Sequence, residues 1–358
     1  MEKSLQNFDI FTFDHRLIEW YETNKRILPW RQTSDPYRIW VSEIMLQQTK
    51  VDTVIDYYQR FLKNYPTIFD LAAAAEEDVL KTWEGLGYYS RARNLHTAAK
   101  DVVTRFDGKV PNDPSLLGDL KGIGPYTRGA ILSIAFGQPE PAVDGNVMRV
   151  LSRVLYIEDN VSDQKVRKRF EEIVRELIHD ADPSAFNQGL MELGALICTP
   201  RKPLCLHCPV NTMCRAHEVG ETDRLPIKLK KKKQRIENYT VLVIQDKTGN
   251  VAIEKRPDKG LLANMWQFPM INQAQADSGM IQKLLSEKYN LHIKLGEHMQ
   301  TIKHVFTHII WNLNVYHATT EKNFSSPLTF EKITSLEDYP ISVSHQKIVK
   351  YLKDLNKE

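Results

Sequence analysis

The sequence predicts a protein of two parts, an all-α region followed by a smaller α+β domain. Apolar residues before residue 225 recur at helical spacing, whereas those after residue 240 alternate as they do in strands. A lysine-rich run lies between the two patterns. A chain of 358 residues is long enough for about two domains, and 42% hydrophobic residues suffice for a packed core in each.

The first part shows amphipathic helices over about two hundred residues. One apolar face comprises Val51, Val54, Ile55, Tyr58 and Leu62, and another comprises Leu95, Ala99, Val102 and Phe106. Asp35 followed by Pro36 predicts a further helix start. A helix is also expected from Asn146 to Tyr156, with Asp144 as its capping residue.

The run from Pro226 to Arg235 carries too many like charges to pack against a core. It is interpreted as a solvated tether, and the linker is placed at residues 225–237. The same positive charges could instead follow a phosphate backbone.

The second part shows the signature of strands. Val241 and Val243 alternate, a turn follows at residues 247–250, and Val251 and Ile253 alternate again, which predicts a hairpin. Residues 304–315 are expected to form one further strand, and residues 280–289 carry a helical stripe. The domain is therefore expected to be α+β.

Composition limits the setting of the protein. The N-terminus lacks a basic segment followed by an apolar one, and no apolar run approaches the roughly 20 residues that span a bilayer. We expect a cytoplasmic monomer, associated with the nucleoid if the cell is bacterial, and no membrane partner. A net charge of +3 permits a polyanionic partner without requiring one.

The four cysteines, Cys198, Cys205, Cys208 and Cys214, fall within seventeen positions. Such clustering indicates a metal or cluster site, although four buried structural thiols remain an alternative. Zinc and iron–sulfur clusters both take four thiolates. Cys205 and Cys208 form the one close pair, flanked by gaps of six and five residues, and this irregular spacing favours the larger cluster.

A glycine turn and two carboxylates mark candidate chemistry. Gly122 and Gly124 flank one apolar residue between two helices, so their turn can hold a phosphate or form an ordinary helical corner. Asp144 follows twenty residues later, where capping and catalysis are compatible roles. Glu43 lies among Val41, Ile44, Met45 and Leu46, and burial there would raise its pKa as a general acid requires. A glutamate on a helix is otherwise most often solvated.

Several segments together carry a resemblance to a known family. They are LPWRQTSDPYRIWVSEIMLQQT, GLGYYSRARNL, LKGIGPYTRGAI, AVDGNVMRV and the four-cysteine loop. Over residues 20–220 they resemble the helix-hairpin-helix DNA glycosylases of the endonuclease III superfamily. Within it, SEIMLQQT with Glu43, the asparagine at 146 and a second domain resemble the MutY adenine DNA glycosylases.

The resemblance implies a multidomain fold. A six-helix barrel would occupy residues 30–134, and residues 1–29 with 135–224 would form a helical lobe that holds a [4Fe–4S] cluster. Residues 238–358 would form a Nudix-like domain.

The same resemblance implies base excision repair of adenine paired with 8-oxoguanine, and with guanine, in double-stranded DNA. Glu43 would protonate adenine at N7, and Asp144 would stay ionised to stabilise the positive sugar, electrostatically or through a transient covalent adduct. Tyr126 and Asn146 would hydrogen-bond Asp144 or the sugar. Bifunctional relatives carry a lysine where this chain has Tyr126, and a phenol cannot form a Schiff base, so only glycosylase activity is expected.

The target adenine must turn out of the DNA duplex before an enzyme can break its glycosidic bond. By resemblance, Gln48, beside Thr49, and the turn Leu86-Gly87-Tyr88 enter the duplex, although core packing would also explain Leu86 and Tyr88. The flipped base would be met by Trp30, Arg31, Leu46 and Gln188.

The second domain would read the lesion rather than hydrolyse a nucleotide. The segment at residues 284–289 lacks the clustered glutamates with which a Nudix hydrolase holds magnesium. Phe306-Thr307-His308 matches the family's Phe-Ser-His loop for 8-oxoguanine, with threonine for serine. Two other functions stay open at this point, an endonuclease III-like pyrimidine glycosylase/lyase and a non-enzymatic iron–sulfur DNA-binding module.

Overall fold

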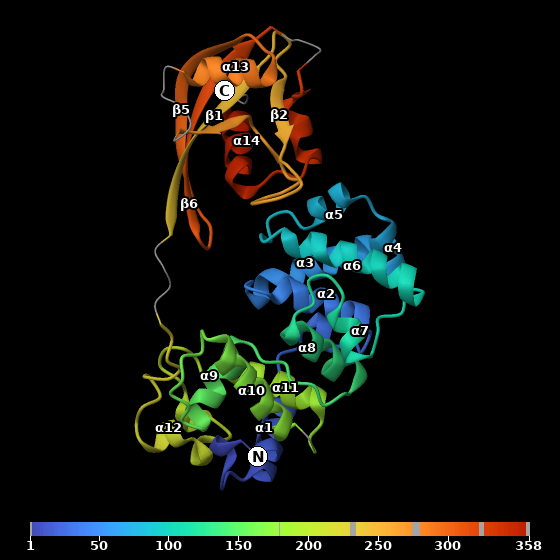
Figure 1. Cartoon of the computed structure of the whole chain (residues 1–358), viewed down its shortest axis with the longest axis vertical. Helices are drawn as coiled ribbons and strands as arrows, with labels where there is room; N and C mark the ends of the chain where they lie inside the picture. The colour runs from blue at the N-terminus through green and yellow to red at the C-terminus, as the bar shows by residue number, and fades with distance from the viewer. Residues whose placement is uncertain (1, 179, 230–233, 274–279, 322–325, 356–358) are drawn as a thin grey trace. The chain divides into compact units, whose positions relative to one another are not determined.

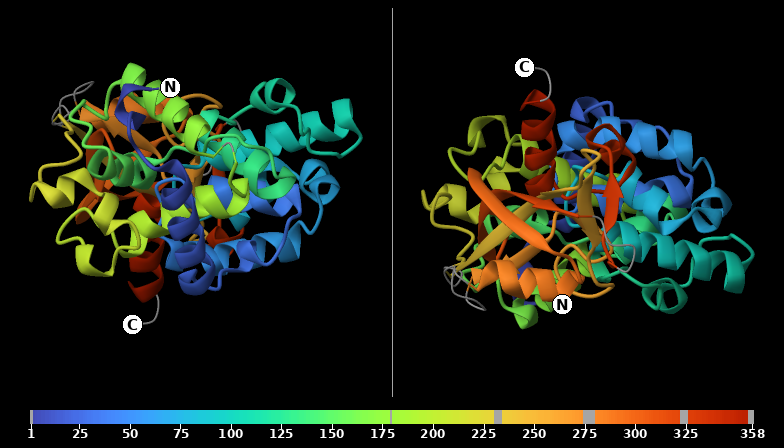
Figure 2. Two further views of the ribbon diagram at one scale, coloured as in Figure 1. Left: turned by 90° about the horizontal axis from the view of Figure 1, so that it is seen from below. Right: turned by 90° about the horizontal axis from the view of Figure 1, so that it is seen from above.

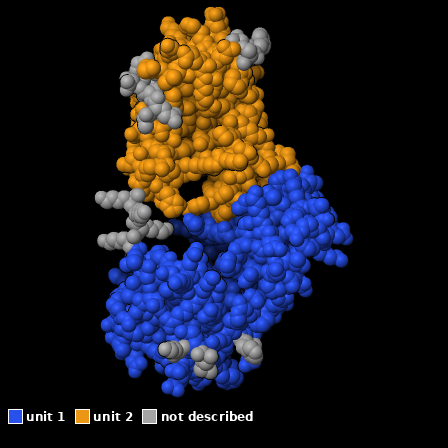
Figure 3. All heavy atoms as spheres, in the orientation of Figure 1, with its two compact units in different colours: residues 1–73, 94–230 blue, residues 74–93, 231–358 orange. Residues whose placement is uncertain are grey.

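The computed structural model describes residues 2–178, 180–229, 234–273, 280–321 and 326–355. The chain divides into two compact units, residues 1–73 with 94–230, and residues 74–93 with 231–358 (Figure 3). The helical part and the strand-rich part are thus separate, as the sequence predicts. Residues 74–93 belong to the second unit, although the barrel was expected to contain them.

The first unit is all-α, and Figure 1 shows its helices in chain order. Its α-helices are α1 (Ile10–Asn24), α2 (Pro36–Leu46), α3 (Val51–Asn64), α4 (Ile68–Ala73), α6 (Ser90–Phe106), α7 (Pro114–Gly118), α8 (Pro125–Phe136), α9 (Gly145–Val154), α10 (Gln164–Leu177), α11 (Pro183–Leu196) and α12 (Arg215–Glu218). Its 3₁₀ turns are η1 (Lys3–Leu5), η2 (Pro29–Arg31), η3 (Cys205–His207) and η4 (Asn211–Met213). Helix α9 ends two residues before the predicted Tyr156.

Aspartate caps begin many of these helices. Asp35, Asp113 and Asp182 each precede a proline and accept hydrogen bonds from backbone N–H groups of the first turn. The first N–H groups of a helix have no partner within the helix, so proline, which has no N–H, loses nothing at this position. Its fixed φ also suits a helix, so each Asp-Pro pair defines a helix start. The prediction of a helix start at Asp35-Pro36 is confirmed.

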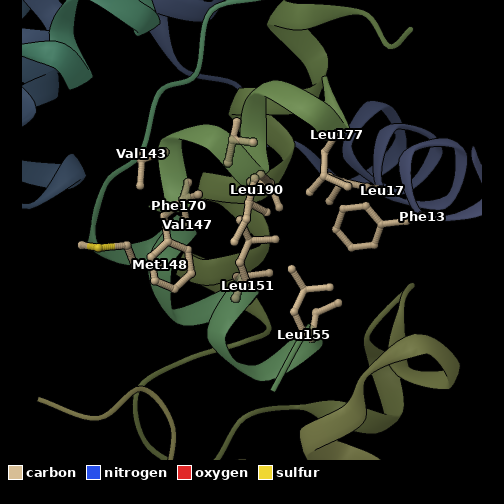
Figure 4. Packing of buried hydrophobic residues seen from close by; sticks show 14 of the residues in the cluster. Phe13, Leu17, Val143, Val147, Met148, Leu151, Leu155, Phe170, Leu177 and Leu190 are labelled. Atoms are coloured by element: carbon tan, nitrogen blue, oxygen red, sulfur yellow. The ribbon is translucent and has the colours of Figure 1, made fainter. Parts of the chain in front are cut away.

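Two packed groups of helices build the first unit. Helix α2 packs on α3 and α8, while α11 packs on α1 and α9. Figure 4 shows the apolar core of the second group, with Phe13 and Leu17 of α1 facing Leu190 of α11 and Leu151 of α9. Helix α8 also contacts α11 and so joins the groups. Side chains from both groups can therefore face one cavity.

The second unit is built on a seven-stranded sheet with the order β3-β2-β1-β6-β5, to which β4 and β7 add at β1 and β2. The strands are β1 (Arg235–Gln245), β2 (Val251–Lys255), β3 (Trp266–Gln267), β4 (Met270–Asn272), β5 (Ile293–Val305), β6 (Ile309–Thr320) and β7 (Thr329–Glu331). Its helices are α5 (Glu76–Thr82), α13 (Ile281–Tyr289), α14 (Val343–Leu355) and the 3₁₀ turn η6 (Ile333–Asp338). The expected hairpin and the helix at 280–289 are confirmed, since β1 pairs antiparallel with β2.

Both faces of the sheet are covered, with α13 and α14 on opposite sides (Figure 2). Val241 and Val243 of β1 enter the core with α14, and Leu242 and Ile244 enter the core with α13. The apolar run in β1 is continuous because this strand, paired in parallel with β6, is buried on both faces.

Two predictions for this unit were wrong. Residues 304–315 form parts of two strands, β5 and β6, which pair antiparallel around a turn at Phe306–His308. The turn contains no glycine, proline or asparagine, so no residue in it signals a chain reversal. Strand β1 begins at Arg235, inside the predicted linker, and residues 230–233 of that linker lie outside the described residues.

Among the residues that the structure describes, no helix is long and apolar enough to cross a membrane.

Candidate active site

A cavity of about 650 Å³ lies in the first unit where its two helix groups meet. It is lined from α2, α8, α11, η2 and the start of α9. The predicted site residues along its wall are Trp30, Arg31, Glu43, Leu46, Gln48, Thr49, Gly122, Gly124, Tyr126, Asp144, Asn146 and Gln188. The two carboxylates, 101 positions apart in the chain, thus face one cavity.

Glu43 is buried on α2, with 5% of its surface exposed. The Tyr126 hydroxyl donates a hydrogen bond of 2.7 Å to its Oε2. Burial, with a smaller contribution from the charge of Asp144, raises the pKa of Glu43. The hydrogen bond from Tyr126 and the charge of Arg31 lower it, and the net result is a pKa of about 7. At neutral pH a large fraction of this carboxyl therefore carries a proton that it can donate.

Asp144 is held as the cap of α9. Its Oδ1 accepts hydrogen bonds of 2.8 Å from the backbone N–H groups of Asn146 and Val147, and its Oδ2 accepts one of 2.8 Å from the Asn146 side chain. Burial raises the pKa of Asp144, and these hydrogen bonds oppose that shift. Asp144 accepts three hydrogen bonds where Glu43 accepts one from Tyr126, so the two settings differ in how well they support a negative charge.

The partners of Tyr126 and Asn146 differ from one another. Asn146 bonds Asp144, in line with the expectation, whereas the Tyr126 hydroxyl lies on Glu43 and also 3.4 Å from the Met191 sulfur. Asn146 is itself held, because its Oδ1 accepts a hydrogen bond of 2.8 Å from Arg149. A Cβ on Gly194 of α11 would come within 2.7 Å of the Asn146 Cβ, so glycine allows this close approach of the two helices.

Four charged residues on the cavity wall were missed by sequence reasoning, namely Arg26, Arg167, Glu171 and Glu192. Glu192 of α11 accepts hydrogen bonds from both Arg26 and Arg31. The spacing could have found it, since Glu192 lies four positions after Gln188 and therefore on the same helical face. Gln188 lines the cavity and donates a hydrogen bond of 3.0 Å to Ser184.

The glycine turn sits at the cavity edge between α7 and α8. Gly122 has a φ of +85°, and a Cβ there would lie 2.7 Å from the Asn94 Cβ, so the position requires glycine. Gly124 caps α8, and a Cβ there would meet nothing within 4 Å. The start of α8 is therefore open on that side, as an anion site at a helix start requires.

The four cysteines also converge. All line one small cavity in the first unit together with Val150, Leu193 and Arg153. Arg153, 1% exposed, donates a hydrogen bond of 3.2 Å to the Cys198 sulfur, a contact suited to a thiolate. Four thiols around one cavity form a donor set that fits a four-thiolate group. Within the described parts of the chain, no three His, Cys, Asp or Glu side chains are placed to hold a single metal ion.

The remaining predicted residues lie in the second unit, around a cavity of about 480 Å³. Gly87 and Tyr88 line it from one side, and Phe306, Thr307 and His308 line it from the other. The Tyr88 and Thr307 hydroxyls are 2.6 Å apart and share a hydrogen bond. Tyr88 is 44% exposed, whereas Leu86 is buried at 6%, so of the two side chains expected to wedge, one faces solvent.

The turn that carries Tyr88 is tightly held. Gly85, Gly87 and Tyr88 all have positive φ, of 95°, 75° and 47°. Arg91 donates hydrogen bonds to the carbonyls of Leu86 and Gly87, at 3.2 and 3.0 Å, and its guanidinium lies 5.3 Å from the centre of the Tyr88 ring. The turn expected at Leu86-Gly87-Tyr88 is confirmed.

Comparison with known proteins agrees with both units. Residues 41–176 match the HhH-GPD superfamily of base excision DNA repair proteins, and residues 240–351 match the NUDIX domain. A solved thermostable thymine-DNA glycosylase is 30% identical and superimposes with a TM-score of 0.55, covering 60% of this chain and 99% of that one. A helical unit with a glycine turn between two helices and paired carboxyls, together with these matches, defines a helix-hairpin-helix repair glycosylase fold.

Curated relatives narrow the class. The adenine DNA glycosylase of Rattus norvegicus is 37% identical over 368 residues, covering 87% of this chain and 71% of the relative. That of Arabidopsis thaliana is 40% identical over 345 residues, and this chain spans 55% of its length. The chain belongs to the adenine DNA glycosylase family.

Proposed function

We propose that the protein excises adenine paired with 8-oxoguanine, and with guanine, from double-stranded DNA as a monofunctional, monomeric glycosylase. The observation that carries the proposal is the pair Glu43 and Asp144, facing one cavity with different hydrogen-bond partners. Family membership supports adenine as the base.

The chemistry follows from the two carboxyls. Adenine is a poor leaving anion, so Glu43 donates its proton to the base as the N-glycosidic bond breaks. Asp144, supported by three hydrogen bonds, carries the negative charge that stabilises the positive sugar. Water then adds to the sugar carbon and passes a proton to the carboxylate left at Glu43, which leaves an abasic site and free adenine. Tyr126 offers no amine for a Schiff base, so the strand stays intact.

A single-turnover assay on an adenine:8-oxoguanine duplex, read before and after alkali, tests the proposal. Adenine release with strand breaks only after alkali is the expected result. Breaks without alkali would identify a glycosylase/lyase instead. Duplex binding without release would identify a non-enzymatic DNA-binding module.

The pH dependence of adenine release should follow the protonation of Glu43. Its protonated form predominates below a pKa of about 7 and is lost as the pH rises through that value. We expect single-turnover adenine release to fall by roughly tenfold per pH unit above about 7. A rate that stays constant or rises through this range would exclude Glu43 as the proton donor.

We further propose that the cysteine cavity holds a [4Fe–4S] cluster on Cys198, Cys205, Cys208 and Cys214. These four thiolates would hold the cluster, which would then crosslink the loop between α11 and α12. Two observations support the assignment. The cysteine spacing resembles that of the endonuclease III superfamily, and all four cysteines line one cavity.

Cys208→Ser should remove most of the visible absorbance and lower bound iron by at least about tenfold, because the variant lacks one of four thiolate ligands. DNA binding should weaken more than the rate of base release from bound duplex. Iron and acid-labile sulfide analysis, with a titration of labelled duplex, measures both. Colourless wild-type protein that contains zinc would contradict the cluster.

We propose that the second unit reads 8-oxoguanine through Phe306, Thr307 and His308. Thr307→Ala combined with His308→Ala should reduce the preference for adenine opposite 8-oxoguanine over guanine by roughly tenfold, the effect of losing one or two hydrogen bonds. The control is Thr301→Ala with His298→Ala, an exposed threonine–histidine pair of β5 whose side chains lie 3.1 Å apart. An unchanged preference in the first variant would place the reading of the lesion elsewhere.

A further inference from the structure

Glu192 of α11 is a buried carboxylate between two arginines, and its side chain is 1% exposed. Arg31 donates to Oε1 and Oε2 at 2.9 and 2.8 Å, and Arg26 donates to the same oxygens at 2.8 and 2.7 Å. The backbone N–H of Arg26 adds a further bond of 3.0 Å to Oε1. Both oxygens of Glu192 are thus fully engaged.

These contacts keep Glu192 ionised. Burial alone would raise its pKa, but the hydrogen bonds from both arginines and the charge of Arg31 lower it to about 2. The cluster of Arg26, Glu192 and Arg31, here named the arginine clamp, therefore carries one net positive charge at neutral pH.

The clamp fixes Arg31 at the wall of the active-site cavity. One side of the guanidinium is bound to Glu192, and Nη1 also donates to the Arg26 carbonyl at 3.2 Å. The Tyr21 ring lies 5.5 Å from the guanidinium carbon. The Arg31 side chain is 11% exposed, so water screens its charge weakly.

Three charged or titratable groups of the surrounding elements influence the pKa of Glu43. They are Arg31 of η2, Tyr126 of α8 and Asp144 at the start of α9. Arg31 favours loss of the Glu43 proton, while Asp144 and burial favour its retention. Burial is the largest of these influences on the pKa of Glu43 and the charge of Arg31 is the smallest, so the clamp acts on Glu43 through Arg31.

We propose that Glu192 is a positioning residue of the reaction, which locks Arg31 against the base-binding cavity and limits the positive charge that the clamp presents there. The inference rests on the proposed function. Glu192 acts on the reaction through Arg31, to which both of its carboxylate oxygens are bonded.

Two charge-changing variants test the electrostatic part of this inference. In Glu192→Gln the clamp carries two net positive charges, so the upper limb of the pH profile for adenine release should move down by roughly half to one pH unit. Glu22→Gln is the matched control, because it removes an exposed carboxylate that pairs with the neighbouring Lys25 and bonds neither arginine of the clamp. Its profile should match the wild type.

Arg31→Lys separates the effect of a fixed side-chain position at residue 31 from the effect of its positive charge. Lysine keeps the positive charge but cannot make the two-pronged contact with Glu192. The upper limb should stay within about 0.2 units of the wild type. The release rate at the optimum should fall by roughly tenfold, because the pocket loses a fixed donor.

The outcomes are decisive in each direction. A folded Glu192→Gln with an unshifted limb, or a Glu22→Gln with the same shift, overturns the inference. If Glu192→Gln does not fold, as its melting curve would show, Arg26→Gln decides instead. That variant lowers the clamp's charge and should move the limb upward, and an unchanged limb overturns the inference. Failure of the proposed function is distinct, because wild-type protein would then release no adenine at any pH.

Discussion

Glu43→Gln is expected to reduce adenine release by about 10³-fold or more, because the amide has no proton of suitable acidity to give to the base. The change is nearly isosteric, and the glutamine carbonyl can still accept the hydrogen bond that the Tyr126 hydroxyl donates to Glu43. Binding to lesion duplex should therefore stay within roughly threefold of the wild type.

Single-turnover release and a duplex titration measure the two quantities separately. Glu22→Gln is again a useful control, since it makes the same substitution at an exposed position of α1. Retained turnover in Glu43→Gln would end its assignment as the acid.

Asp144→Asn should have the second-largest effect, a loss of release on the order of 10³-fold, because it removes the negative charge that stabilises the sugar cation. The helix cap should survive, since asparagine caps as well as aspartate and its oxygen can accept from the Asn146 and Val147 N–H groups. The asparagine cannot accept the hydrogen bond from the Asn146 side chain, but burial opposes the charge of Asp144, so removing that charge offsets the loss and the variant should melt close to the wild type.

Release kinetics and thermal unfolding, followed on the same preparation, separate the two roles of Asp144. A large loss of both activity and stability would mean that the cap, rather than the charge, is what Asp144 provides. Near-normal release would remove it from the mechanism.

Local signals in the sequence predicted the helices and the first hairpin well. The pair Asp35-Pro36 alone predicts the start of α2. The β1–β2 turn is equally explicit, because Gly249 takes a φ of +84° and Asp246 accepts from the Thr248 and Asn250 N–H groups. Such features depend on a few neighbouring residues, which the sequence shows directly.

Contacts between distant residues were harder to predict. The Tyr126 hydroxyl reaches Glu43 across 83 positions, and nothing in either neighbourhood distinguishes this partner from Asp144. The spacing from Gln188 could have placed Glu192 on the cavity face of α11, but its pairing with Arg26 and Arg31 depends on the packing of α11 against α1. The turn at Phe306–His308 was missed because its residues suit a strand. Helix packing and sheet pairing decide these positions, and both depend on the whole unit.

If the turn at Leu86–Tyr88 enters the duplex, as the resemblance implies, its rigidity affects the speed of the search along DNA. The positive φ of Gly87 and Tyr88, that of Gly85 just before them, and the contacts from Arg91 restrict the segment before any duplex arrives. The entropy of ordering it is lost during folding, so little more is lost at each encounter with a base pair. A rigid probe of this kind suits a protein that must test many intact pairs and leave them quickly.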